Sequence, residues 1–324
     1  MATPPLRALA AGHGLTLGAA VDAAALRDDA RYRALLAREF NGVTPENALK
    51  FAPLRPRRER FDFAAAEAIV AFAEAHGMRV RGHALVWHRA LPDWLVSGRF
   101  GRAELTAILR EHIATVVGHF RGRVAAWDVV NEGLPVAHDP ARAASVWLRG
   151  IGPAYFDLAF RWAHAADPGA RLFYNDDGAE GGGAKAEAID ALVRGLLARG
   201  VPLHGVGLQG HVGLATIPDR GALAATLRRF AALGLATELT EVDVRLQDGT
   251  GTPAARLTAQ AGVYHDLGLA ACAAPRCAGL TVWGVTDRHS WIPGHTGRPD
   301  APLLFDADYA PKPAYGALRE ALQG

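Results

Sequence analysis

Short apolar segments alternate with longer helical segments along the whole chain, and this alternation constrains the fold more than any other feature. The short segments are rich in apolar and β-branched residues, which is typical of strands. They occupy the ranges 15–21, 42–44, 78–85, 124–130, 170–174, 205–208, 235–239 and 280–283. Eight strands that alternate with helices predict an α/β fold consisting of a single (β/α)₈ TIM barrel.

The longer segments place their apolar residues at the spacing of one helix face. Such helices are predicted over 62–76, 102–120, 153–166, 183–199, 219–233 and 253–273. An open, doubly wound sheet is the structural alternative. That fold usually has a glycine-rich nucleotide-binding turn after its first strand, and GHGLTLGAAVD is not such a turn.

Composition and charge narrow the domain count and the class of partner. No linker rich in Ser, Gly or Pro divides the 324 residues, so we expect one catalytic barrel domain over 1–324 without an accessory binding module. Lys and Arg number 35 against 33 Asp and Glu, a balance that does not favour nucleic acid or an anionic membrane as the partner. A neutral substrate is compatible with this balance. We also expect a monomer.

The location of the protein is predicted from its segments and its cysteines. No stretch approaches the ~20 apolar residues that span a bilayer, so a soluble protein is expected. Cys272 and Cys277 are separated by AAPR and offer too few ligands for a metal site. A disulfide between them is slightly favoured over two free thiols. It would indicate a secreted or periplasmic protein whose signal segment is absent from this sequence, with a cytoplasmic location as the alternative.

Polar residues follow nearly every predicted strand, at the end of the barrel where catalytic groups lie. In chain order they are Glu46, Asn47, Lys50, His83, Trp87, His88, Asn131, Glu132, Asn175, Asp176, Gln209, His211, Glu241, Asp243 and Trp283. This mixture of carboxylates, imidazoles and tryptophans at one mouth indicates an active site.

Two of these carboxylates are candidates for glycoside hydrolysis. Glu132 ends the fourth strand beside Trp127, and such low-dielectric surroundings favour a protonated acid. Glu241 ends the seventh strand, so the two can face one bond from opposite sides. A separation of ~5–5.5 Å predicts retention of configuration, and ~6.5–9.5 Å predicts inversion. Glu238 is the rival of Glu241: in a regular strand it points to the opposite face, and periodicity alone does not select between them.

Two other classes of function compete with this interpretation. His83, His88, His211 and Asp243 could bind a catalytic metal, but the His-x-His spacing common in such sites is missing.

A sugar-binding protein without turnover is the other class. Trp87, Trp283 and Trp291 suit stacking on sugar rings whether or not a bond is broken. Trp147 and Trp162 lie on predicted helices, where core packing is expected.

Seven strings of the sequence together resemble a known family. They are TPENALKF, RGHALVWHRALPDWL, AAWDVVNE, LFYND, GVGLQGH, LTEVDVRL and LTVWGVTDRHSW. In order and spacing they resemble glycoside hydrolase family 10, the retaining endo-β-1,4-xylanases. The resemblance extends from Leu15 to Tyr315 and implies a double-displacement cleavage of internal β-1,4-xylosidic bonds, without metal or organic cofactor.

The resemblance also implies a role for each matching residue. Glu132 resembles the acid/base and Glu241 the nucleophile, since the family's Thr-Glu-x-Asp element continues to Asp243 and so selects Glu241 over Glu238. His211, oriented by Asp243, would keep the nucleophile ionised, and Asn131 would bond the sugar 2-hydroxyl. The implied substrate-binding residues are Glu46, Asn47, Lys50, His83, Trp87, Asn175, Gln209, Trp283 and Trp291.

The sequence departs from the family pattern at two positions. Ala90 replaces the Gln of WHxQLP, and Asp177 replaces the Tyr of NDYN. These changes leave two alternatives open for the substrate: xylo-oligosaccharides or another β-glycan in place of xylan. A carbohydrate binder without turnover is the alternative outside enzymes. The cysteine pair lies where secreted relatives often carry a disulfide, which strengthens the expectation of that bond.

Overall fold

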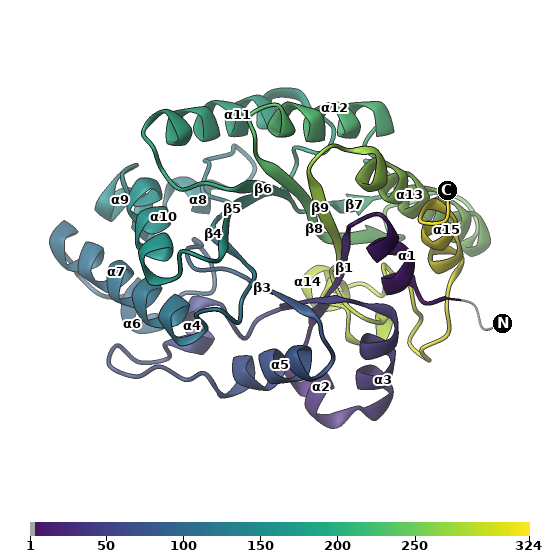
Figure 1. Ribbon diagram of the computed structural model, residues 1–324, viewed down its shortest axis with the longest axis horizontal. Helices are drawn as coiled ribbons and strands as arrows, with labels where there is room; N and C mark the ends of the chain where they lie inside the picture. The colour runs from purple at the N-terminus through teal and green to yellow at the C-terminus, as the bar shows by residue number, and fades with distance from the viewer. Residues whose placement is uncertain (1–3) are drawn as a thin grey trace.

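The computed structural model describes residues 4–324, which form a closed parallel barrel surrounded by helices (Figure 1). Each strand pairs with its neighbours in parallel, and the last barrel strand pairs with the first, which closes the sheet. The barrel strands are β1 (Thr16–Val21), β2 (Gly42–Pro45), β3 (Arg79–Gly82), β4 (Ala126–Asn131), β5 (Arg171–Asp176), β6 (Gly205–Leu208), β8 (Ala236–Arg245) and β9 (Cys277–Val282). The predicted (β/α)₈ barrel is confirmed.

The six helices predicted from periodicity are present on the outside of the barrel. They are α5 (Ala64–Ala75), α7 (Arg102–His119), α10 (Tyr155–Ala166), α11 (Gly183–Ala198), α12 (Arg220–Ala231) and α13 (Pro253–Ala273). Local signals set their starts: the Asp219 carboxylate accepts from the amide of Ala222, and Thr252 accepts from that of Ala255. Side chains such as Ile113 and Val116 of α7 are fully buried in the core between helices and strands.

Further helices complete the ring or lie in the loops. Outside the barrel are α1 (Leu6–Gly12), α2 (Ala23–Asp28), α3 (Ala30–Glu39) and α15 (Pro313–Ala321). The loops that follow strands hold α4 (Phe51–Leu54), α6 (Asp93–Val96), α8 (Pro140–Ala143), α9 (Val146–Ile151), the 3₁₀ turn η1 (Asp287–His289) and α14 (Ile292–Thr296). A short strand, β7 (His211–Gly213), pairs with the carboxyl end of β8 and extends the wall of the mouth.

Close packing between β3 and β4 positions the first site loop. A Cβ atom on Gly82 would lie 2.2 Å from the Trp127 ring, so only glycine lets the two strands approach with this side chain between them. Trp127 is completely buried. The chain enters the site at His83, directly after this contact.

The predicted disulfide is not formed in the structure: Cys272 and Cys277 are both free thiols. Cys272 lies in the last turn of α13 and Cys277 is the first residue of β9. The Cys277 thiol instead contacts the carbonyl oxygen of Gly279 at 3.7 Å. Burial raises the pKa of Cys277 to about 11 and also raises that of Cys272, so both thiols stay protonated at neutral pH. No helix within residues 4–324 is long and apolar enough to cross a membrane.

Candidate active site

A cleft of about 1120 Å³ lies at the carboxyl ends of the strands, as the barrel predicts. Twelve of the fourteen predicted site residues line it. They are Glu46, Asn47, Lys50, His83, Trp87, Asn131, Glu132, Gln209, His211, Glu241, Trp283 and Trp291. Asn175 and Asp243 lie behind this surface.

Glu132 follows the last residue of β4, and its carboxylate is held from several sides. The side-chain amide of Gln209 donates to its Oε1 at 3.0 Å, and that of Asn131 does so at 3.4 Å. Its backbone has φ of 52°, in the left-handed region that a Glu seldom adopts. The amide N–H of Glu132 donates to the Asn175 carbonyl at 2.9 Å, which ties this turn to β5.

Glu241 is deeply buried, with 4% of its surface exposed, and polar groups surround its carboxylate. Asn175 donates to Oε1 at 2.7 Å, while the His211 Nε2 lies 3.3 Å from Oε2 and the His83 Nδ1 lies 3.8 Å from Oε1. Burial alone raises the pKa of Glu241, but the His83 charge and the His211 hydrogen bond outweigh it and lower the pKa. The group is therefore held as a carboxylate.

His211 is oriented by a carboxylate behind it. Its Nδ1 lies 2.9 Å from Oδ2 of Asp243, and the same oxygen accepts a hydrogen bond from the Trp291 indole at 2.8 Å. Burial opposes charge on the imidazole, but Asp243 and Glu241 raise the pKa of His211 well above its usual value. A protonated His211 thus bridges two buried carboxylates.

Asn175, predicted to bind substrate, is instead completely buried and does not line the cleft. Its side-chain amide donates to Asn131 Oδ1 at 2.9 Å and to Glu241 Oε1 at 2.7 Å, and its own oxygen accepts from the Thr240 hydroxyl at 2.6 Å. All hydrogen bonds of the Asn175 side chain go to neighbouring side chains. Asn175 therefore positions Asn131 and Glu241 relative to each other.

A second group of polar residues, Glu46, Asn47 and Lys50, also lines the cleft. The Lys50 ammonium donates to Asn47 Oδ1 at 2.9 Å and lies 5.1 Å from the centre of the Trp87 ring. Burial raises the pKa of Glu46 to about 7, against the opposing charge of Lys50. Burial also lowers the pKa of Lys50. The resemblance assigns Glu46, Asn47 and Lys50 to the glycone-side subsites, and all three line the cleft.

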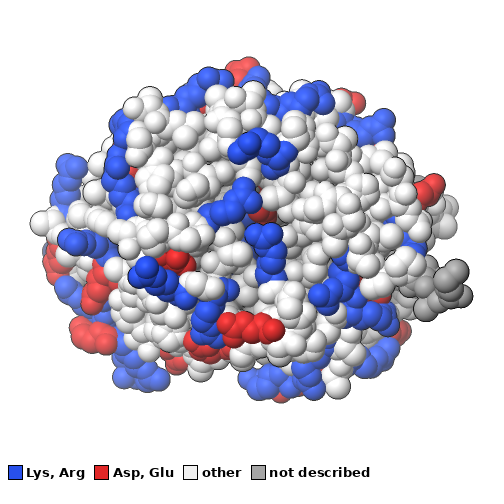
Figure 2. Space-filling view, in the orientation of Figure 1, with Lys and Arg blue, Asp and Glu red and all other residues white. Residues whose placement is uncertain are grey.

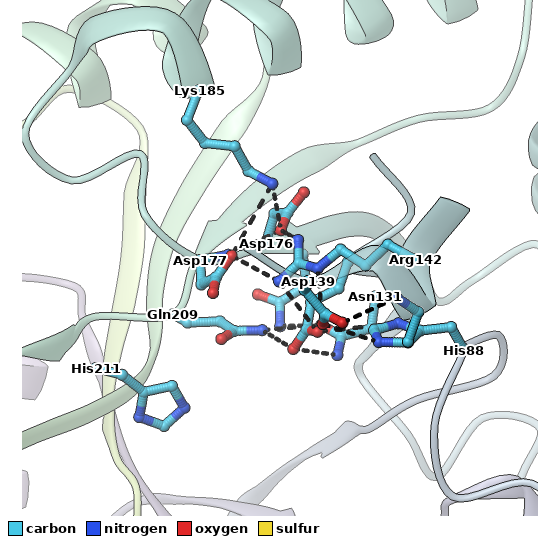
Figure 3. A network of polar contacts seen from close by, with 12 residues as sticks. His88, Asn131, Asp139, Arg142, Asp176, Asp177, Lys185, Gln209 and His211 are labelled. Atoms are coloured by element: carbon cyan, nitrogen blue, oxygen red, sulfur yellow. Dashed lines mark hydrogen bonds and ion pairs between the residues drawn. The ribbon is translucent and has the colours of Figure 1, made fainter. Parts of the chain in front are cut away.

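Arg142 at the end of the short helix α8 is a site residue that sequence reasoning missed. Its Nη2 lies 3.1 Å from Oε2 of Glu132 and 2.8 Å from Oδ1 of Asp177, and its Nη1 lies 2.7 Å from Oδ1 of Asp176. Figure 3 shows Asp176 and Asp177 beside the guanidinium of Arg142, with Lys185 of α11 reaching both carboxylates. Arg142 is 2% exposed. It is the cation nearest to the predicted acid/base.

The structure separates the histidines that could have shared a metal. His83 lies 3.0 Å from Asp128 and His88 lies 3.2 Å from Asp139, while His211 pairs with Asp243. Each imidazole thus has its own carboxylate.

Among residues 4–324, one other cluster has suitable ligand atoms: His88, Glu132 and Asp139. Arg142 lies 3.1 Å from Glu132 and 3.5 Å from Asp139 and supplies a positive charge at that place.

Glu238 is also placed differently from the prediction. It does not point away from the barrel interior. Its carboxylate accepts from Arg81 at 2.8 Å and lines a small cavity at the opposite end of the barrel. The pairing of β8 with β9 shifts between Leu239 and Val242, and this irregularity lets Glu238 and Glu241 both face inward at different depths.

The tryptophans divide as predicted. Trp283 and Trp291 line the cleft together with Trp87. Trp147 is buried and Trp162 packs against the core.

Comparison with known proteins identifies the family of this chain. Residues 5–321 match the family described as Glycosyl hydrolase family 10. Endo-1,4-beta-xylanase B of Thermotoga neapolitana is 40% identical over 98% of this chain and 92% of its own length. The crystal structure of xylanase 10B from Thermotoga petrophila RKU-1 in complex with xylobiose has a TM-score of 0.94 at 39% identity and covers 100% of this chain and 98% of its own. Penicillium canescens endo-1,4-beta-xylanase XylE has a TM-score of 0.94 at 34% identity, with 99% and 98% covered. The chain belongs to glycosyl hydrolase family 10.

Proposed function

We propose that this protein is a retaining endo-1,4-β-xylanase. The observation that carries the proposal is the contrast between two carboxyl groups in one cleft. Glu241 is buried and kept ionised by histidines, as a nucleophile needs, whereas Glu132 is held at the cleft surface by amides and Arg142. The family membership and the names of the relatives support xylan as the substrate class.

The reaction proceeds in two displacements. Glu241 attacks the anomeric carbon while Glu132 protonates the departing glycosidic oxygen, which leaves a covalent glycosyl-enzyme. Glu132, now a carboxylate, then takes a proton from water, and the hydroxide displaces Glu241. The configuration at the anomeric carbon is inverted twice and so retained.

Asn131, next to Glu132 in the sequence, is the residue that we expect to bind the reacting sugar. The side chain of Asn131 donates to Glu132 and accepts from Asn175 and Gln209, and Asn175 also donates to Glu241. Asn131 is thus held next to the reacting carboxylates, where it can bond the sugar 2-hydroxyl. A hydrogen bond there strengthens as positive charge develops on the sugar.

The wall of the cleft supplies binding rather than chemistry. Glu46, Asn47 and Lys50 supply polar contacts, and Trp283 and Trp291 supply flat apolar surfaces for sugar rings. We further propose that one barrel works as a monomer and that the reaction needs no metal.

A preference for xylo-oligosaccharides is the second candidate function. The resemblance expects a tyrosine where Asp177 stands, and the Asp177 carboxylate is engaged with Arg142. Without that aromatic surface, long chains lose a stacking contact beyond the cleavage point, while short substrates lose less.

Sugar release decides between these functions. The protein should release reducing sugars from xylan and from xylo-oligosaccharides, and the ratio of the two kcat/KM values ranks the substrates. No release from either between pH 4 and pH 9 would contradict an enzymatic function.

The roles of the two carboxylates need a separate test. A 2-fluoro-xylobioside should label Glu241. With azide and an aryl xylobioside, Glu132→Ala should give the β-glycosyl azide through the glycosyl-enzyme, whereas Glu241→Ala should give only the α-azide by a single displacement. Glu238→Gln is the matched control, three residues away on the same strand, and it should remain active. A label on Glu238 would reverse the assignment.

A further inference from the structure

The amino-terminal end of the barrel, opposite the cleft, carries an excess of positive charge. Figure 1 faces this end, since β7 and α14, which follow strand ends, lie behind the barrel. Figure 2 shows blue side chains over the centre of this face. Arg79 and Arg171 begin two of the strands, and Arg276 immediately precedes a third.

A cavity of about 30 Å³ opens between these strand starts. Arg79, Arg81, Arg171, Glu238 and Thr44 are among the residues that line it. One water molecule needs roughly 10–15 Å³ by the same kind of measure, so the cavity holds about two oxygen-sized atoms.

The charges around this cavity are unevenly paired. Arg81 is fully engaged, because it donates to Asp128 at 2.5 Å and to Glu238 at 2.8 Å. Within residues 4–324, no carboxylate or carbonyl accepts a hydrogen bond from the side chain of Arg171, which lies 5.4 Å from the ring of Phe173. The three guanidinium groups of the lining, those of Arg79, Arg81 and Arg171, thus face two carboxylates, Glu238 in the lining and Asp128 beside Arg81.

This imbalance of charge acts on Arg171, whose side chain is half-buried. Burial lowers the pKa of Arg171, and the charges of Arg79, Arg81 and Arg276 lower it further against the opposite effect of Glu238. An anion beside Arg171 would relieve both the repulsion and the lost hydration.

A buried hydroxyl provides an independent observation. Thr44 is 1% exposed and lines the same cavity, and its Oγ1 has no hydrogen-bond partner in the described chain. A buried hydroxyl without a hydrogen-bond partner destabilises the folded state, so such groups are normally hydrogen-bonded. An oxygen of an anion in the cavity would accept a hydrogen bond from the Thr44 hydroxyl.

We propose that this amino-terminal cavity binds one small oxyanion, such as inorganic phosphate, between Arg171, Arg79 and the Thr44 hydroxyl. Two oxygens of a tetrahedral anion fill the cavity, and the others face solvent. Guanidinium groups suit such oxygens because their N–H donors are fixed in a planar fork. The site is separate from the active site and independent of the proposed function. Binding there stabilises the folded barrel.

Thermal unfolding in phosphate tests the site. Phosphate is raised from 0 to 50 mM at pH 7 while NaCl keeps the ionic strength constant, and calorimetric titration measures stoichiometry. We expect one phosphate per chain and a saturable rise in Tm of roughly 2 °C. An excess of xylobiose should not displace the phosphate, and displacement would place the anion in the cleft and overturn the proposal.

Three variants make the test specific. Arg171→Gln should lose the rise in Tm while keeping the kcat on xylan. Arg110→Gln removes the same charge from an exposed position on α7 and should keep the rise. Arg79→Gln, at an exposed position that lines the cavity, should weaken the phosphate Kd about fivefold and tests the site if Arg171→Gln does not fold. No rise in the parent protein, a full rise in Arg171→Gln, or an unchanged Kd in Arg79→Gln would overturn the proposal.

Discussion

Replacing His211 with Asn should move the acid limb of the pH profile to higher pH. His211 Nε2 lies 3.3 Å from the Glu241 carboxylate, and its charge and hydrogen bond help to lower the pKa of Glu241. The shorter Asn side chain is neutral and removes both effects. Burial raises the pKa of Glu241, and in the variant fewer groups counteract this effect. The pKa of Glu241 is therefore higher, and the nucleophile becomes protonated at a higher pH.

The size of the shift follows from the interaction that is lost. A hydrogen bond to a charged group contributes about 1.5–3 kcal/mol, and one pKa unit corresponds to about 1.36 kcal/mol. The acid limb should therefore rise by about 1–2 pH units. His83 stays 3.8 Å from Glu241 and keeps part of the effect, which favours the lower end of this range.

The assay is kcat/KM between pH 3 and pH 9 on an aryl xylobioside. Its good leaving group needs little protonation, so the acid limb reports on the nucleophile rather than on Glu132. His76→Asn, at an exposed position after α5, is the control and should leave the profile unchanged. If His211→Asn lowers kcat/KM equally at every pH, His211 acts by shape alone and the electrostatic reasoning is refuted.

Three further predictions follow from the site and its surroundings. Because Glu46 has its pKa raised to about 7, the KM for xylotriose should change between pH 6 and pH 8, and this step should vanish in Glu46→Gln. Asp177→Tyr supplies an aromatic surface worth about 0.5–1.5 kcal/mol, so the KM for xylohexaose should fall by about threefold, with no such fall for xylobiose. Lys312→Met leaves the buried Asp287, which Lys312 contacts at 3.0 Å, without its cation. The free energy of unfolding in urea at pH 7 should fall by about 3–5 kcal/mol, and Asp287→Asn in the same chain should restore part of it.

The barrel could be predicted from the sequence because its signal is repeated in every strand. Each strand is short and apolar, and each is followed by a helix or loop that starts with polar residues. The N-terminal helices were missed for a physical reason: α2 and α1 are rich in alanine, which gives a weak apolar stripe. Their positions are set by packing on the barrel rather than by their own pattern.

The site could be predicted only where it depends on strand ends. Glu132 and Glu241 follow from the regular geometry of the barrel and from the family resemblance. The burial of Asn175 does not, because it depends on how Thr240 and Asn131 pack around it. The inward direction of Glu238 does not either, since a register shift in β8 breaks the alternation on which periodicity relies.

Arg142 shows why the departure at Asp177 has consequences beyond sugar binding. The Asp177 carboxylate and the Glu132 carboxylate both contact the same Nη2 atom, at 2.8 Å and 3.1 Å. Asp177 therefore has two effects. It takes the place of an aromatic surface in the cleft, and its negative charge partly neutralises Arg142, which contacts the acid/base Glu132. Arg142 comes from a loop ten residues beyond Glu132, and no strand-end rule predicts where that loop returns. Because the guanidinium is shared, any substitution at Asp177 changes the electrostatics of the acid/base together with the binding of the leaving group.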